Sequence, residues 1–339
     1  MVVLGQGFAL GAVFGGLGAQ LRLQGLRQAL AVLVGALEGR RSVASVDLRI
    51  SDATGELQLV LACKGGRLPG GKAWARELIR TVPGLVSVAV SEADPHGKRV
   101  MGRRPRMVAG EAELTERIGA TSYALYPGAF FQADPQNAVQ IHDLVREGVG
   151  NARRVADLYA GVGAYARMLA PSVDRVFAVE EVPQAARAAR AGGPDNLEVV
   201  ASRVEDVVLQ ERFDAVVVNP ARHGCEPEAL VAIARCTDRM VMVSCGPESF
   251  ARDLDVLAAH GLRVAALHAG TQGYAYGPVE LHASALGPAG AVRQFLRPTD
   301  EGQRCLHASR VRPPALFRGR RSWVSHPLFE LRLHQGAGI

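Results

Sequence analysis

The chain has 339 residues, of which 48% are hydrophobic and 21% are charged, with a formal net charge of +6. This length exceeds one typical domain and can bury a sizeable core, so we expect two domains. Five cysteines without paired spacing argue against a disulfide framework and a zinc module, and we expect no metal cluster and a reducing, cytoplasmic setting.

The first segment, residues 1–40, is an apolar, glycine-rich lead followed by a helix over residues 21–37. A secretory signal needs a positive charge ahead of its apolar run, whereas the first basic residue is Arg22. The glycines also make the run a poor membrane span. We therefore expect neither a signal peptide nor a membrane partner.

From residue 41 to residue 118 the hydrophobic period changes and indicates a smaller α+β domain. Residues 43–50 and 56–62 alternate as two strands of a hairpin. A helix over 74–81 and a strand over 85–90 follow. This domain could hold substrate, although a packing role is the default interpretation.

Residues 119–288 are the second predicted domain, and a glutamine stands near its beginning. Asp134 and Pro135 have the pattern of a helix start, with Asp as the N-cap and Pro at the first helical position. Gln132 lies just before that cap and could present its amide to a ligand. A surface-loop glutamine is the alternative.

A glycine-rich turn between a strand and a helix follows at Asp157-Leu-Tyr-Ala-Gly161-Val-Gly163. The two glycines let the backbone approach a ligand closely. The spacing also fits the dinucleotide pattern G-x-G-x-x-A, and Glu180, which ends the next strand, suits a ribose diol in either case. Asp157 favours the cationic end of S-adenosylmethionine, because a carboxylate sits badly beside a pyrophosphate.

Further strands and helices alternate along the rest of this domain. The pattern predicts a doubly wound parallel sheet, and two late strands without a helix between them predict a final antiparallel hairpin. This is the α/β outline of a class I, Rossmann-like methyltransferase. The strands are expected at residues 197–200, 214–219, 240–244, 263–268 and 280–286.

The strand over 240–244 stops at Cys245, and Gly246-Pro247 then opens a helix. The thiol is thus expected at the carboxyl end of a strand and facing a helix N-terminus. Ligands bind in that crevice of open α/β sheets, and the helix end lowers the pKa of a thiol. Cys245 is a candidate nucleophile, and a small hydrophobe that closes the strand is the alternative.

The turn Asn219-Pro-Ala-Arg222 ends the neighbouring strand. Taken with FFQ, DLYAGVG, AVE and VSCGP in this order, it resembles the RNA uracil-5 methyltransferase family over residues 40–288. The resemblance implies that Cys245 adds to C6 of a uridine in ribosomal or transfer RNA and that Glu280 is the base that removes the C5 proton. It implies Arg222 as a substrate contact and S-adenosylmethionine held by Gln132, Asp157, Tyr159, Gly161, Gly163, Glu180 and Asn219.

The sequence departs from the family pattern in three places. Asn219-Pro-Ala-Arg222 replaces the usual Asp-Pro-Pro-Arg, Gly246 replaces an asparagine, and Arg203 stands where an acidic residue is common. We also expect neither the oligonucleotide-binding barrel nor the iron-sulfur cluster of many members. Three rivals therefore stay open: a degenerate binder of RNA or cofactor, a methyltransferase with another substrate, and a nicotinamide-dependent oxidoreductase.

Residues 289–339 are predicted to form an arginine-rich extension. Arginines release counterions from phosphates and aromatic side chains stack on bases, so we hypothesise a segment that grips RNA. A solvated or packing extension is the alternative. The arginines are Arg293, Arg297, Arg304, Arg310, Arg312, Arg318, Arg320, Arg321 and Arg332.

Overall fold

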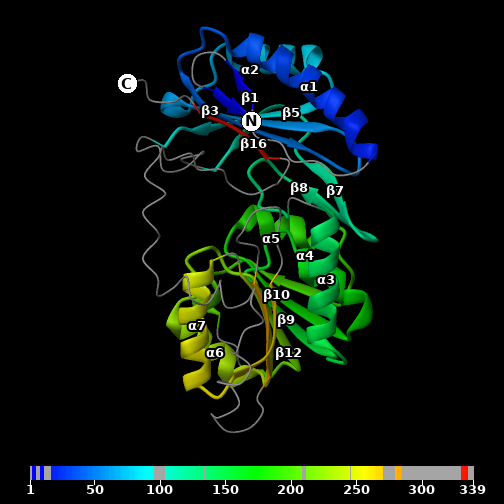
Figure 1. Cartoon of the computed structure of the whole chain (residues 1–339), viewed down its shortest axis with the longest axis vertical. Helices are drawn as coiled ribbons and strands as arrows, with labels where there is room; N and C mark the ends of the chain where they lie inside the picture. The colour runs from blue at the N-terminus through cyan, green and yellow to red at the C-terminus, as the bar shows by residue number, and fades with distance from the viewer. Residues whose placement is uncertain are drawn as a thin grey trace. The chain divides into compact units, whose positions relative to one another are not determined.

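The computed structural model describes residues 2–4, 8–10, 17–94, 104–132, 135–207, 211–244, 246–269, 279–284 and 330–334. The chain divides into two compact units, Met1–Gln136 with His326–Ile339, and Asn137–Ser325 (Figure 1). This division lies later in the chain than the boundary predicted after residue 118.

The first unit contains short strands at its beginning, two helices and a five-stranded sheet. Its elements are β1 (Val2–Leu4), β2 (Phe8–Leu10), α1 (Leu17–Leu37), β3 (Val43–Ile50), β4 (Leu57–Cys63), a 3-10 turn (Lys64–Gly66), α2 (Gly71–Thr81), β5 (Leu85–Glu92), β6 (Arg106–Gly110), β7 (Leu114–Ile118), β8 (Thr121–Leu125) and β16 (Glu330–His334).

The five-stranded sheet has the order β16-β3-β4-β5-β6. The antiparallel pairing of β3 with β4 confirms the predicted hairpin, and β5 joins β4 in parallel after α2. Strand β16 pairs antiparallel with β3, with Arg332 opposite Asp47. The end of the predicted arginine-rich extension is therefore an edge strand of this sheet, while residues 289–329 lie outside the described residues.

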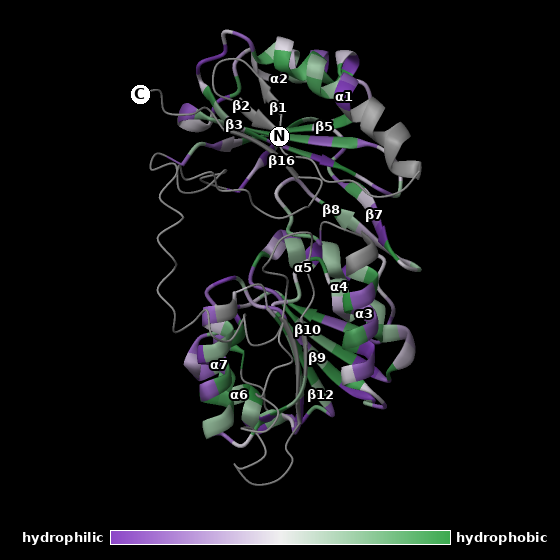
Figure 2. Ribbon diagram, in the orientation of Figure 1, coloured by the Kyte–Doolittle hydropathy of each residue, from purple (hydrophilic) through white to green (hydrophobic). Residues whose placement is uncertain are grey.

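Both helices of the first unit cover the same face of its sheet. Leu33 of α1 and Leu78 of α2 are fully buried against strand residues such as Leu59. Side chains alternate between the two faces along each strand. The apolar residues of the strands that face α1 and α2 form one buried cluster with these helices, and hydrophobic residues are green in Figure 2.

Side chains of the other face hold the segment that follows β6. Ser51 Oγ donates to the carbonyl of Thr115 at 2.6 Å, and Gln58 Nε2 donates to that of Leu125 at 3.2 Å. Arg49 donates to the carbonyl of Ala129 at 2.5 Å. These bonds explain why residues 119–136 belong with the first unit.

The second unit alternates strands and helices. Its elements are α3 (Pro135–Val149), β9 (Arg154–Leu158), α4 (Ala164–Leu169), a 3-10 turn (Ala170–Ser172), β10 (Arg175–Val179), α5 (Pro183–Arg190), β11 (Leu197–Val200), a 3-10 turn (Val204–Asp206), β12 (Ala215–Val218), α6 (Pro227–Cys236), β13 (Arg239–Ser244), α7 (Pro247–Ala259), β14 (Arg263–Ala269) and β15 (Val279–Ser284).

These strands form one sheet of order β11-β10-β9-β12-β13-β15-β14. Strands β9 to β13 pair in parallel, and β15 lies antiparallel between β13 and β14. The predicted α/β class with a parallel sheet and a final antiparallel hairpin is confirmed.

Helices cover both faces of this sheet (Figure 1). Val155 and Val217 face α3, α4 and α5, whereas Leu158 and Val218 face α6 and α7. All four side chains are fully buried, as expected for parallel strands covered on both sides. None of the helices in the described ranges has both the length and the apolar character required to cross a membrane.

The strand order reverses between β9 and β12, which are direct neighbours. Open α/β sheets bind ligands at the carboxyl ends of the strands beside such a reversal. Tyr159 follows β9 and Asn219 follows β12, and the Asn219 amide donates to the carbonyl of Leu158 at 3.3 Å. The fold thus places two predicted site residues side by side at this point.

Candidate active site

The turn between β9 and α4 has the strained backbone that its glycines allow. Gly161 and Gly163 have φ angles of 58° and 80°, and Tyr159 has a φ of 61°. A Cβ on Gly163 would lie 3.0 Å from that of Ala189, whereas a Cβ on Gly161 would meet open space. The turn is therefore packed against α5 at Gly163 and open to a ligand at Gly161.

Asp157 lies on β9 and is completely buried. Its Oδ2 accepts the Ala166 amide at 2.8 Å, and its Oδ1 has no hydrogen-bond partner within the described part of the chain. Burial raises the pKa of this carboxyl, the Ala166 amide lowers it and the Glu180 charge raises it, which together bring the pKa to about 7.

We expect the buried Asp157 carboxyl to make stability depend on pH. Between about pH 4 and pH 7 the folded chain keeps a proton that the unfolded chain releases, so the free energy of unfolding falls as pH rises. Asp157→Asn has no such proton to lose. Its free energy of unfolding relative to wild type should therefore rise by about 2–4 kcal/mol from pH 5 to pH 8. Urea unfolding of the cofactor-free chain measures it, with the exposed Asp195→Asn as the control. An equal difference at every pH would contradict the assignment.

Glu180 follows β10 and is nearly buried. Its Oε2 accepts the Gly161 amide and its Oε1 accepts the Val182 amide, both at 2.8 Å. The carboxylate predicted to bind a ribose diol therefore also holds the glycine-rich turn in place.

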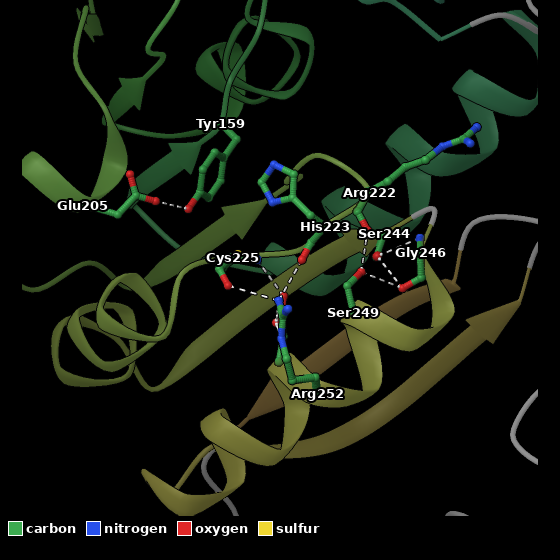
Figure 3. A network of polar contacts seen from close by, with 10 residues as sticks. Tyr159, Glu205, Arg222, His223, Cys225, Ser244, Gly246, Ser249 and Arg252 are labelled. Carbon is green, nitrogen blue, oxygen red and sulfur yellow. Dashed lines mark hydrogen bonds and ion pairs between the residues drawn. The ribbon is translucent and has the colours of Figure 1, made fainter. Parts of the chain in front are cut away.

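The Tyr159 side chain points toward Glu205 of the 3-10 turn after β11 (Figure 3). Its hydroxyl donates to Glu205 Oε1 at 2.8 Å, and Arg203 forms an ion pair with Glu205 Oε2 at 3.4 Å. Burial, together with neighbouring Cys225 and Glu205, raises the pKa of the Tyr159 hydroxyl. The hydroxyl thus links the glycine-rich turn to the 3-10 turn after β11.

The loop after β12 exposes Arg222 and His223 and buries Cys225. The Ser249 hydroxyl of α7 donates to the carbonyl of Arg222 at 2.7 Å and to that of Gly246 at 3.0 Å. The loop is therefore tied to the turn that carries Cys245.

Gly246, which departs from the family pattern, has no room for a side chain. A Cβ there would lie 2.5 Å from the carbonyl oxygen of Arg222 and 2.6 Å from Ser249 Oγ. The loop after β12 fills the space into which an asparagine would project, so Gly246 is required by this loop.

Gly246→Ala should lower the free energy of unfolding by about 1–3 kcal/mol, because backbone atoms of Arg222 must move. The control is Gly35→Ala in α1, where a Cβ meets nothing within 4 Å and helix propensity improves. Thermal unfolding compares the two variants. Equal stability of Gly246→Ala and wild type would show that the loop yields freely.

Cys245 itself lies outside the described residues, between Ser244 and Gly246. Strand β15 pairs with β13 so that Glu280 is opposite Val243 and Val279 is opposite Ser244. The backbone of the predicted base therefore lies at the end of the sheet where the cysteine follows β13.

The three cysteines that the structure describes are all buried. Burial raises the pKa of the Cys63 and Cys236 thiols to about 11 and that of Cys225 to about 12. None of them is a suitable nucleophile, because the thiolate is the reactive form.

The second unit therefore brings together most of the predicted cofactor residues, whereas Gln132 lies in the first unit. Sequence reasoning missed Glu205, Ser249, Arg252 and Asp253, which connect the loops at the strand ends. Their roles depend on tertiary contacts, and no local motif marks them.

No protein-family model matches the chain. It is 33% identical over 229 residues to an uncharacterized RNA methyltransferase of Gloeobacter violaceus. This alignment covers 66% of the chain and 50% of that protein. An uncharacterized RNA methyltransferase of Halalkalibacterium halodurans is 30% identical over 234 residues, with 66% and 51% covered. The chain thus spans about half the length of these relatives.

Among solved structures, the chain is similar to the Pyrococcus abyssi tRNA (uracil-54, C5)-methyltransferase in complex with S-adenosyl-L-homocysteine. The TM-score is 0.60 at 24% identity, over 77% of this chain and 67% of that one. The strand order, with its reversal between β9 and β12, and the likeness to this solved structure both indicate a class I methyltransferase fold. The chain is homologous to bacterial proteins named RNA methyltransferases, and its second unit has the class I methyltransferase fold.

Proposed function

We propose that the chain transfers a methyl group from S-adenosylmethionine to C5 of a uridine in ribosomal or transfer RNA. One observation carries this proposal. The glycine-rich turn held by Glu180 and the strand leading to Cys245 reach the same end of the sheet, and Glu280 is in register opposite Val243. The names of the relatives support an RNA substrate, and the name of the structural neighbour supports uracil C5.

The residues around the glycine-rich turn fit S-adenosylmethionine. Asp157 Oδ1 is buried without a hydrogen-bond partner among the described residues and suits a cationic group. The space at Gly161 is open, and the carboxylate of Glu180, just after β10, suits the hydroxyls of a ribose diol. Asn219 completes this set at the end of β12, and Gln132 stays a predicted contact. When bound, S-adenosylmethionine supplies a methyl group on a positively charged sulfur.

Uracil C5 needs activation before it can accept that methyl group. The Cys245 thiolate adds to C6, and the electron pair of the C5–C6 double bond moves onto C5 and the O4 enolate. The carbon then has the charge required to attack the methyl group. Helix α7 begins at Pro247, so its positive end favours the thiolate form of the preceding cysteine.

The second half of the reaction restores the aromatic base. Glu280 accepts the C5 proton, the double bond re-forms, and the C6–S bond breaks to return the Cys245 thiolate. The net change on uridine is the replacement of hydrogen by methyl. This step requires the carboxylate next to the cysteine, as the register of β15 with β13 suggests.

The uridine must leave its base stack to enter such a site. Sequence-selective recognition of RNA targets single-stranded loops, bulges and ends, so the target is expected there. Arg222 is exposed at the end of β12 and is suited to an RNA oxygen.

Asn219 favours a second candidate, a domain that binds cofactor or RNA without turnover. An amide at this position cannot carry the charge of the aspartate usual in the resembled family. Gly246 no longer supports this alternative, because the Arg222 carbonyl occupies its side-chain space.

Nucleoside mass spectrometry tests the proposal. Unmodified ribosomal and transfer RNA is incubated with the purified chain and methyl-deuterated S-adenosylmethionine, then digested to nucleosides. We expect labelled 5-methyluridine. Label on another base would assign a different substrate, and cofactor binding without any label would favour the binder. Thermal shifts with S-adenosylmethionine and NAD in parallel would expose a nicotinamide enzyme.

A further inference from the structure

Helix α7 carries a pair of charged residues, Arg252 and Asp253, that contact the loop after β12. Arg252 donates from one nitrogen to the carbonyls of His223 at 2.8 Å and Cys225 at 3.2 Å. Asp253 accepts the Cys225 amide at 2.8 Å through Oδ2. Figure 3 shows Arg252 reaching across to this loop from α7.

The two residues also bind each other. Arg252 donates to Asp253 Oδ1 through Nε at 3.0 Å and through a terminal nitrogen at 2.5 Å. The Asp253 side chain is fully buried, whereas that of Arg252 is half exposed. A buried carboxylate is stable only when its oxygens are paired, so Asp253 requires both the arginine and the loop amide.

The loop has adapted its backbone to this pair. Gly224 has a φ of 81°, and a Cβ there would lie 2.4 Å from Asp253 Oδ2 and 2.5 Å from an Arg252 nitrogen. Only glycine fits so close to both groups in this conformation. The approach of the pair to the loop is therefore built into the chain at Gly224.

This contact sets the position of exposed side chains at the site. The carbonyl of His223 faces Arg252, whereas the His223 ring and the Arg222 side chain point away from Arg252 (Figure 3). The Ser249 hydroxyl joins Arg222 to Gly246, the residue after Cys245. One turn of α7 thus fixes the loop relative to the cysteine turn.

We propose that Arg252 and Asp253 are positioning residues for methyl transfer. They hold residues 222–225 so that Arg222 and His223 meet the uridine beside Cys245, and His223 is a substrate contact. This inference rests on the proposed function. Among the described residues, the hydrogen bonds of the pair join it to the loop after β12 and not to the glycine-rich turn or Glu180, so its effect falls on turnover and leaves cofactor affinity unchanged.

The test compares Arg252→Gln, Arg252→Lys and His223→Ala with Arg212→Gln. Arg212 lies before β12, at the end of the strand opposite the site, and pairs with exposed Asp238. Its replacement removes the same positive charge as Arg252→Gln but away from the site. Methyl transfer to unmodified ribosomal and transfer RNA transcripts gives kcat and KM. Calorimetry gives the S-adenosylmethionine affinity, and hydrogen exchange reports the amides of residues 222–226.

We expect Arg252→Gln to lower kcat about ten- to a hundredfold, since small misplacements have effects of that size. Exchange at residues 222–226 should accelerate, and cofactor affinity should stay within about twofold of the control, whose exchange is unchanged. Arg252→Lys should recover part of kcat, because an ammonium can donate to a loop carbonyl but lacks the Nε–H that also binds Asp253. His223→Ala should raise KM for RNA without altering exchange.

Unchanged kcat and exchange in Arg252→Gln would overturn the proposal. Parallel losses of cofactor affinity, thermal stability and kcat in both Arg252 variants would reduce the pair to a structural role and also overturn it. Wild-type KM in His223→Ala would remove the substrate contact. If the wild-type chain methylates neither RNA, the proposed function fails, while the exchange data still decide whether the pair holds the loop.

Discussion

A Cys245→Ala variant should lose methyl transfer to RNA by at least about a thousandfold and still bind S-adenosylmethionine. Without the thiolate no adduct forms at C6, and C5 of uracil is too weak a nucleophile to take the methyl group. The cofactor is expected to contact the turn held by Glu180, which the substitution leaves intact. Label transfer to unmodified transcripts and calorimetry with the cofactor measure the two effects.

Cys236→Ala is the matched control for this variant. Cys236 is the last residue of α6 and is buried in the core, where its thiol donates to the carbonyl of Ile233 at 3.3 Å. Burial raises its pKa to about 11, so it supplies no thiolate at neutral pH. We expect turnover close to wild type. Substantial activity in Cys245→Ala would show that the reaction does not pass through this thiol.

Glu180→Gln should weaken S-adenosylmethionine binding by about ten- to a hundredfold. The carboxylate accepts the amides of Gly161 and Val182, and a neutral amide can present only one oxygen to them. A hydrogen bond to a charged group contributes about 1.5–3 kcal/mol, so losing it loosens the turn on which the cofactor rests. The expected bond to the ribose is weakened as well. Calorimetry with the cofactor measures the change.

Glu198→Gln removes a carboxylate from the neighbouring strand β11 and serves as the comparison. Glu198 is half exposed and pairs with Arg175 at 2.6 Å, an ion pair of the sheet surface. Its loss should leave cofactor affinity unchanged, because exposed pairs contribute little. If both variants bind the cofactor as wild type does, Glu180 has no role in the cofactor site.

Most of the second unit could be predicted because its signals are local. The uninterrupted apolar run of β13 is typical of a strand covered on both faces, and all residues from Met240 to Ser244 are buried. Proline begins α5, α6 and α7, as expected for a residue that suits a first helical turn. Alternation of such elements defines the doubly wound sheet without any knowledge of long-range contacts.

Elements of the first unit that depend on distant partners escaped prediction. Strand β16 is an edge strand only because it pairs with β3, nearly the whole chain away in sequence. In β6 and β7 charged residues such as Arg106 and Glu116 interrupt the apolar pattern. Glu116 is nevertheless buried, and its carboxylate accepts the amides of Asp52 and Ala53. That compensation is a tertiary contact.

For the candidate site, the sequence could identify groups at strand ends but could not show how they are joined. Tyr159 was predicted as a cofactor contact, and the structure shows its hydroxyl bonded to Glu205. The sequence shows Gly246 only as a departure from the family pattern, because its role depends on the Arg222 carbonyl oxygen, 2.5 Å from where its Cβ would lie. Close approaches of this kind arise from packing and leave no local pattern.

A covalent complex between the chain and 5-fluorouridine RNA would test the central claim most directly. With fluorine in place of hydrogen at C5, Glu280 has no proton to remove there. The Cys245–C6 bond therefore persists after methyl transfer. The account predicts a denaturation-resistant complex that forms only with S-adenosylmethionine, carries one added methyl group and maps to Cys245. Methylation of ordinary transcripts without such a complex from fluorinated ones, or a complex at another residue, would contradict it.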